Sequence, residues 1–407
     1  MRISTKSIYE NATTQLNTLQ SNMARTQMQL ATNKRMLTAA DDPIASARAL
    51  EVTQSKSLNE QYATNRSNAN SSLSLVEGAL GDSGDLLMDV QALVVQAGNG
   101  TLSKSDRLMI ATEIEGRMQD LLGVANTADG SGGYLFSGYR GTTVPFIQTD
   151  SGAAYQGDQG QRKLQVGSSR AIAISDSGSS IFENNRTGNG SYQTKMVDGN
   201  QGGAIAVSGS VADASKLTGH NYTLAFKVAG TPAVTTYSVT DTSTSPHSSV
   251  LADEPYVSGK QIAFDGTSFA ITGAPAHGDK FEVKPSEKES IFTTMTNLVN
   301  ALRDSGEDTN ARATLSNKLN TASEGLKSSL DNILTVRASV GSRMKELDYL
   351  DSSGSDLGIQ YDATLSKLQD LDIVKAISQY ATQQTTLEAA QKSFKTMSSL
   401  SLFNYIG

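Results

Sequence analysis

Proline is distributed unevenly along the chain, and this most constrains its fold. Six of the seven prolines lie between residues 145 and 285, and Pro43 is the only one outside that segment. Because a proline in a helix interior costs about 3 kcal/mol, the two long flanks that lack it are free to form helices. We therefore expect a mainly α-helical chain with a central β insert.

The N-terminal flank carries a stripe of residues spaced three and four apart, which is typical of a coiled coil. The stripe runs through Ile8, Ala12, Leu16, Leu19, Met23, Thr26, Leu30, Asn33 and Leu37. Asp41 and Asp42 then precede Pro43. Asp42 can cap a helix and Pro43 fits a first helical position, so this sequence predicts a helix restart.

The C-terminal flank shows the same kind of pattern from Ile291 to the end of the chain. Its last part carries Ile373, Ile377, Tyr380, Leu387, Ala390, Phe394, Met397 and Leu400, interrupted by Gln384 and Gln391. Two apolar stripes at opposite ends of one chain can cover each other by pairing. The order helix, β insert, helix predicts a long antiparallel helical bundle or coiled coil formed by both chain ends. This topology needs only short connections and no knot.

The middle of the chain alternates as β-strands do. Leu164, Val166, Ile172 and Ile174 predict a hairpin near residues 155–175. Farther on, apolar residues recur at every second position in five runs: Tyr222 to Val228, Tyr237 with Val239, Ile262 with Phe264, Phe269 with Ile271, and Phe281 with Val283. These short strands predict a β domain over residues 196–286.

Composition argues against most catalytic chemistry. The 407 residues include no cysteine, which excludes thiolate metal sites and a cysteine nucleophile. The three histidines, His220, His247 and His277, leave little room for acid–base or metal chemistry. A net charge of −7 does not fit a general nucleic-acid binder. We expect no cofactor and no metal.

One short motif keeps an enzyme alternative open. Gly81-Asp82-Ser83-Gly84 matches the fragment around a serine-protease nucleophile, which would make the chain a secreted serine hydrolase using Ser83. The motif lies in a helical flank without a histidine, so a chance match is favoured. We see no cleavable secretory signal and no apolar run long enough to span a membrane.

The two chain ends look suited to burial in an assembly. Residues 1–30 and 374–407 each carry a net charge of +2 within an acidic chain and contain few charges. With Thr26, Asn33, Gln384 and Gln391 in its seam, a two-helix pair would be weak, so we expect these ends to be disordered in the monomer and to fold against neighbouring subunits. The expected assembly interface comprises Leu16, Leu19, Met23, Leu30, Leu37, Ile373, Ile377, Leu387, Phe394, Met397, Leu400 and Phe403.

Several passages resemble a known family. Residues 1–5 with Tyr9, residues 29–35 followed by Asp41-Asp42-Pro43, and residues 134–138 are similar to type 3 flagellar hook-associated proteins, the hook–filament junction proteins of the flagellin superfamily. Residues 155–158, 275–281 and 402–406 extend the resemblance over the whole chain. Asn33 and Ala40 replace the family's usual Gly and Ser. Filament flagellin is the alternative, although its opening and helix restart differ.

This resemblance implies a structural, non-catalytic component of the bacterial flagellum. The implied partners are identical subunits in a ring, the first hook-associated protein, flagellin, and an export chaperone at the C-terminal helix, with no nucleic acid and no membrane. The implied location is extracellular, at the hook–filament junction, after type III export without a cleaved signal peptide. The implied division is a terminal coiled coil (1–40 with 372–407), a helical rod with a hairpin (41–195 with 287–371) and an exposed β domain (196–286).

Overall fold

The computed structural model describes residues 5–399 and divides the chain into two compact units. The first unit joins the two ends, with residues up to Thr64 and residues from Tyr349 onward. The second comprises residues Asn65–Asp348. Leu400 and Phe403 of the expected interface lie outside the described residues.

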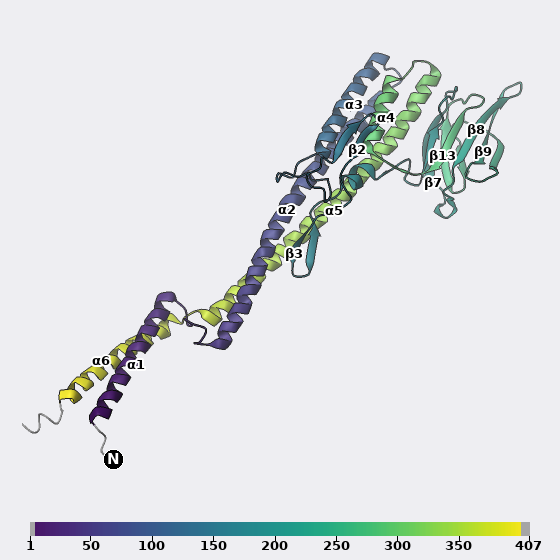
Figure 1. Cartoon of the computed structure of the whole chain (residues 1–407). Helices are drawn as coiled ribbons and strands as arrows, with labels where there is room; N and C mark the ends of the chain where they lie inside the picture. The colour runs from purple at the N-terminus through teal and green to yellow at the C-terminus, as the bar shows by residue number, and fades with distance from the viewer. Residues whose placement is uncertain (1–4, 400–407) are drawn as a thin grey trace, which may run out of the picture. The chain divides into compact units, whose positions relative to one another are not determined.

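Long helices form both flanks (Figure 1). They are α1 (Thr5–Thr32), α2 (Pro43–Ala97), α3 (Lys104–Ala125), α4 (Ile291–Arg303), α5 (Thr309–Gln369) and α6 (Ile373–Ser399). Within the first unit, α1 packs along α6, and the chain direction makes the pair antiparallel. The predicted fold class, helical flanks that pair around a β domain, is confirmed.

A seven-residue repeat holds the helical part of the second unit together. On α2, Leu73, Leu80 and Leu87 are fully buried. On α5 the buried positions recur with the same period at Leu319, Leu326, Ile333, Val340 and Leu347. This is the seam of a coiled coil, in which each apolar side chain inserts between residues of the facing helix. The guanidinium of Arg337 on α5 pairs with Glu77 on α2 at 2.6 Å beside the seam.

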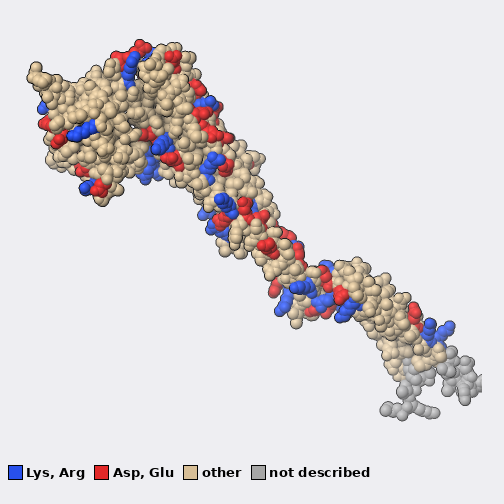
Figure 2. Space-filling view, turned by 180° about the vertical axis from the view of Figure 1, so that it is seen from behind, with Lys and Arg blue, Asp and Glu red and all other residues tan. Residues whose placement is uncertain are grey.

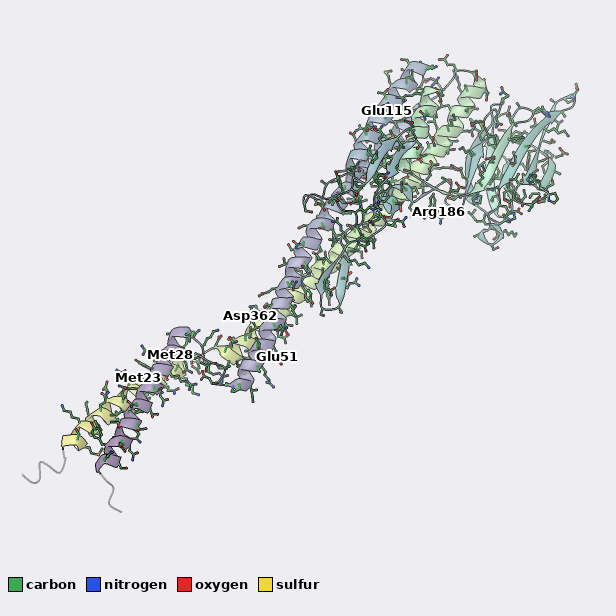
Figure 3. The ribbon with its side chains drawn as sticks, in the orientation of Figure 1. Met23, Met28, Glu51, Glu115, Arg186 and Asp362 are labelled. Atoms are coloured by element: carbon green, nitrogen blue, oxygen red, sulfur yellow. The ribbon has the colours of Figure 1, made fainter. Side chains whose placement is uncertain are left out.

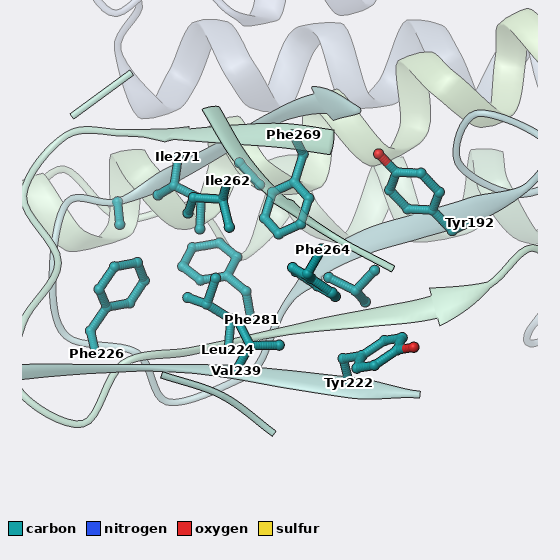
Figure 4. Close-up of a cluster of buried hydrophobic side chains, with 13 residues drawn as sticks. Tyr192, Tyr222, Leu224, Phe226, Val239, Ile262, Phe264, Phe269, Ile271 and Phe281 are labelled. Carbon is teal, nitrogen blue, oxygen red and sulfur yellow. The ribbon is translucent and has the colours of Figure 1, made fainter. Parts of the chain in front are cut away.

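The β domain is a sandwich of two antiparallel sheets. The larger sheet has the order β10-β9-β8-β13-β6 and the smaller one β11-β12-β7. The strands are β6 (Tyr192–Met196), β7 (Ile205–Val211), β8 (Tyr222–Ala229), β9 (Val234–Asp241), β10 (Ser248–Pro255), β11 (Gln261–Phe264), β12 (Thr267–Thr272) and β13 (Lys280–Pro285). Their inward residues, including Leu224, Phe226, Phe269, Ile271 and Phe281, form one buried cluster (Figure 4). The alternation seen in the sequence therefore marks the core faces.

The second unit also contains smaller strands and helical turns. They are β1 (Phe146–Thr149), β2 (Gly152–Tyr155), β3 (Lys163–Gly167), β4 (Arg170–Ala173), β5 (Asn185–Arg186), β14 (Lys288–Glu289), and the helical turns Ser179–Glu183 and Ala214–Lys216. The predicted hairpin is the β3–β4 pair, in which Leu164 lies opposite Ile172. Phe146, Phe182 and Phe292 pack around each other and bring β1 against α4, with ring centroids 5.2–6.1 Å apart.

Candidate assembly site

The candidate site is the first unit, because the sequence places the expected interface there. Its centre is the pair of α1 and α6. The less exposed residues of α1 include Ala12, Leu16, Leu19, Met23, Thr26 and Leu30, whose successive spacings are three and four. Thr26 is buried to 3% exposure, and its hydroxyl donates to the Asn22 carbonyl in its own helix. The stripe predicted for the first helix is therefore the face that meets α6.

On α6 the seam keeps Tyr380, Leu387, Ala390 and Phe394 of the predicted stripe, but Ala376 and Gln383 take inward positions and Ile373 and Ile377 do not. It comprises Ala376, Tyr380, Gln383, Leu387, Ala390 and Phe394, of which Ala376 and Leu387 are buried. Tyr9 of α1 packs on Phe394 with ring centroids 4.9 Å apart. Gln384 and Gln391 were expected to interrupt the seam, but both are exposed. Gln383 takes the inward position, and among the described residues its side-chain carbonyl oxygen has no hydrogen-bond partner.

The shifted seam leaves a second apolar face of α6 uncovered. Ile373, Val374 and Ile377 are 50%, 80% and 55% exposed, and Met397 is also exposed. Met28 is exposed on α1, whereas Met23 lies at the seam (Figure 3). Few charged side chains lie on the visible face of the pair, and blue and red side chains gather where α1 ends (Figure 2). Sequence reasoning missed Val374, although its place beside Ile373 and one turn before Ile377 was a readable signal.

The position of Leu37 also differs from the prediction. It was expected in the first helix, but α1 ends at Thr32 and Asn33 takes a left-handed φ of 55°. Asparagine tolerates this conformation better than most residues, and the turn stops the helix. Leu37 therefore lies half-buried in the connecting segment, where its backbone N–H donates to Asp41.

This connecting segment crosses the one between α5 and α6. The Arg35 N–H donates to the Gln369 carbonyl at 2.7 Å, and the Leu371 N–H donates to the Asn33 carbonyl at 3.2 Å. The Arg35 guanidinium also donates to the Leu368 carbonyl at 3.0 Å. We call residues 33–42 with 368–372 the joint. Its backbone bonds tie the two ends of the chain together at one place.

Two carboxylates stabilise the joint. Asp41 accepts from the Thr38 and Leu37 N–H groups and pairs with Arg25 at 2.6 Å. Hydrogen bonds from the Thr38 and Leu37 N–H groups, together with Arg25, lower the pKa of Asp41. Asp42 accepts from the Ala45 N–H at 3.0 Å, which caps α2 as predicted, and this bond lowers the pKa of Asp42. Both carboxylates are therefore held in the charged form.

Replacing Asp42 tests the joint. Asp42→Ala removes the cap of α2 and the partner of Arg35, so we expect faster amide exchange at Ala45 and Ser46 with no change in the β sandwich. The control is Asp370→Ala, which removes the same charge from an exposed position of the joint. Equal exchange at Ala45 in the two variants would show that the cap contributes nothing.

The structure does not support the enzyme alternative. Ser83 is completely buried in α2, and its hydroxyl donates to the Ala79 carbonyl at 2.8 Å. His220 lies 2.7 Å from Asp241 in the β sandwich, and His277 accepts from the Val228 N–H. Ser83 therefore lacks both the access and the base that a nucleophile requires. Within residues 5–399 there is no group of three or more His, Cys, Asp or Glu side chains that could hold a metal ion. None of the helices in that range combines the length and the apolar character that a membrane span requires.

The fold agrees with that of known proteins. The protein-family model for the bacterial flagellin N-terminal helical region matches residues 3–141. The family model for the D2-like domain of flagellar hook-associated protein 1 matches residues 197–285. Flagellar hook-associated protein 3 of Escherichia coli (strain K12) is 30% identical over 404 residues, which covers 99% of each chain. The chain belongs to the flagellar hook-associated protein 3 family. It is a structural protein of the bacterial flagellum, a hook-associated junction protein.

Solved structures agree with this membership. Hook-associated protein 3 of Legionella pneumophila aligns with a TM-score of 0.74 at 30% identity, covering 78% of this chain and 98% of that chain. Polar flagellin A of Vibrio parahaemolyticus is 34% identical over 90 residues, only 21% of this chain. The similarity to hook-associated protein 3 therefore extends over parts of the chain that this flagellin match does not reach.

Proposed function

We propose that the chain connects the filament to the hook side of the flagellum by packing α1 and α6 between neighbouring subunits. The observation that carries this proposal is the apolar face of α6 that α1 leaves uncovered, with Ile373, Val374 and Ile377. Burying an apolar side chain of this size is worth about 1.5–3 kcal/mol. A face of this kind on a weakly charged helix pair marks a site for another protein surface.

The residues of the interface divide into two groups. Leu16, Leu19, Met23, Leu30, Leu387 and Phe394 contribute to the pairing of the two ends, while Ile373, Ile377 and Met397 offer side chains to a neighbour. Val374 joins the second group. Leu37 would contribute through the joint, and Leu400 and Phe403, which lie outside the described residues, stay predicted members of the interface. The neighbours we propose are identical subunits in a ring, the first hook-associated protein on one side and flagellin on the other.

Export completes the proposal. By its family, the chain would leave the cell through the flagellar type III route without a cleaved signal peptide, with a chaperone bound to the C-terminal helix, and would act outside the cell at the junction. Ends that fold only against neighbours would suit passage through a narrow channel. The division into a terminal coiled coil, a rod and an exposed β domain would then separate the parts that assemble from the part that faces outward.

Amide exchange in the monomer tests the folding of the ends. The α1–α6 pair buries few apolar side chains and has the polar residues Thr26 and Gln383 at inward positions, so it stabilises the two helices only weakly. We expect residues 5–32 and 373–399 to exchange within minutes in a verified monomer, while the α2–α5 seam around Leu80 and Ile333 stays protected for hours. Uniformly slow exchange across both ends would contradict the proposal that they fold on assembly.

A deletion strain tests the function and the absence of catalysis together. Cells lacking this protein should keep intact hooks and release flagellin into the medium. Restoring the chain with Ser83→Ala should return motility to the level of the unchanged chain, because that hydroxyl bonds only within its helix turn in the structure. Filaments that stay attached in the deletion strain would overturn the assembly role. If the unchanged chain restores motility and a stably folded Ser83→Ala variant does not, the enzyme alternative would be reopened.

A further inference from the structure

The β sandwich rests on α5 through polar side chains. Asn317 of α5 accepts from the Ala206 N–H at 2.8 Å and donates to the Ala204 carbonyl at 2.9 Å. One helical turn later, Asn320 donates to the Ala206 carbonyl at 3.0 Å. These bonds reach the start of β7, which is the outer strand of its sheet. The asparagine amides therefore satisfy backbone groups that a sheet edge otherwise leaves unpaired.

A small cavity lies beside these bonds, between β6, β7 and α5. Its volume is about 10 Å³, and its polar lining includes Thr194, Ser208, Asn320, Thr321 and Glu324. A space of this size accommodates a single water molecule if the water finds two to four polar partners. Larger hollows flank it, of about 250 Å³ beside Lys195 and Lys318 and about 590 Å³ beside Arg186 and Asp331.

One side chain at the cavity needs a further partner, and a partly buried carboxyl group lines the same space. The Thr194 hydroxyl oxygen is buried, and among the described residues it has no hydrogen-bond partner. Burial raises the pKa of Glu324, and a hydrogen bond from Ser208 offsets this only in part. Buried hydroxyl groups in native proteins are almost always paired with protein or with ordered water. The cavity therefore has the size, the polarity and an unpaired group that a bound water requires.

We propose that one structural water occupies this cavity, hydrogen-bonded to Thr194 and to Glu324, and completes the polar contact that holds the β sandwich on α5. The water accepts from or donates to the Thr194 hydroxyl and bridges it to the carboxyl group on the helix. The contact between sandwich and rod is then continuous from Asn317 through Asn320 to Glu324, which share one face of α5 at spacings of three and four. This inference does not depend on the proposed assembly function.

Whether Thr194→Val lowers or raises the midpoint of thermal unfolding distinguishes a cavity that holds water from an empty one. Thr194→Val replaces the hydroxyl with a methyl group of nearly the same shape. If water is bound, the variant removes one of its partners, and we expect the midpoint of thermal unfolding of the full chain to fall by about 2–4 °C. If the cavity is dry, the variant removes an unsatisfied buried hydroxyl, and the midpoint should rise.

Thr223→Val is the matched control, since Thr223 lies on β8 of the same sheet and does not line the cavity. It accounts for the general preference of strands for valine. A crystal structure of the full chain should in addition show density for a water about 2.6–3.2 Å from Thr194 Oγ1. A midpoint for Thr194→Val equal to or above that of Thr223→Val, or a cavity without density, would overturn the proposal.

Discussion

Removal of residues 372–407 should abolish attachment of filaments while leaving the second unit folded. The deletion takes away α6 entirely, so the inward residues of α1, among them Leu16, Leu19 and Met23, lose the helix that covers them. The core of the β sandwich and the α2–α5 seam contain no residue of the deleted segment. We expect swarming to stop, flagellin to appear in the medium, and the thermal transition of the second unit to stay within about 2 °C of that of the full chain.

The full-length chain expressed at the same level in the same strain is the control for this deletion. Secretion of the truncated chain should be measured separately, by its amount in the medium, because the deletion also removes the proposed chaperone site. Normal motility of cells carrying the truncated chain would contradict the assignment of the ends to assembly. Loss of the β-sandwich transition would instead show that the two units are not independent in stability.

The double variant Val374→Asp with Ile377→Asp should prevent assembly without unfolding the monomer. Both side chains are more than half exposed in the single chain, so their replacement costs the monomer little, within about 0.5 kcal/mol. In the proposed interface each would lose about 1.5–3 kcal/mol of apolar burial and would add a charge without a partner. Since every subunit of the proposed ring would carry the change, we expect non-motile cells that release flagellin.

Gln384→Asp provides the matched control for the double variant. Position 384 is exposed on the same helix, and the substitution also introduces a negative charge there. It should leave swarming close to normal and should give the same far-UV circular dichroism as the double variant. Equal loss of motility in both would indicate a general effect of charge on α6, and normal motility of the double variant would remove the uncovered face from the interface.

Much of the fold could be predicted from local patterns. Exclusion of proline separates the helical flanks from the β insert because a proline interrupts the helix hydrogen-bond ladder wherever it stands. The capping role of Asp42 is likewise a property of a single residue and its neighbours. The left-handed turn at Asn33 was not predicted, because the helical spacing continues through it to Leu37. The inward faces of the strands follow from an alternation that needs no knowledge of the partner sheet.

The candidate site was only partly predictable. The stripe on α1 was readable because only one apolar face is present there. The last helix carries two candidate faces, one through Ala376, Gln383 and Leu387 and another through Ile373 and Ile377. An amphipathic pattern gives the direction of an apolar face but not which partner covers it, and at the start of the helix the second face carries the larger aliphatic side chains. This is why Gln384 was placed in the seam and Gln383 was not.

Local patterns alone indicate which parts of this chain are mainly helical, which part is a β domain, and that the two weakly charged ends pair with each other. These properties depend on residue type and spacing over one or two helical turns or a single strand. The folded chain was needed to show which face of α6 meets α1, how the joint ties Arg35 to Gln369, and which polar groups of α5 support the sandwich. Such contacts join residues tens to hundreds of positions apart, and packing selects among them by shape and hydrogen-bond satisfaction, which no local pattern records.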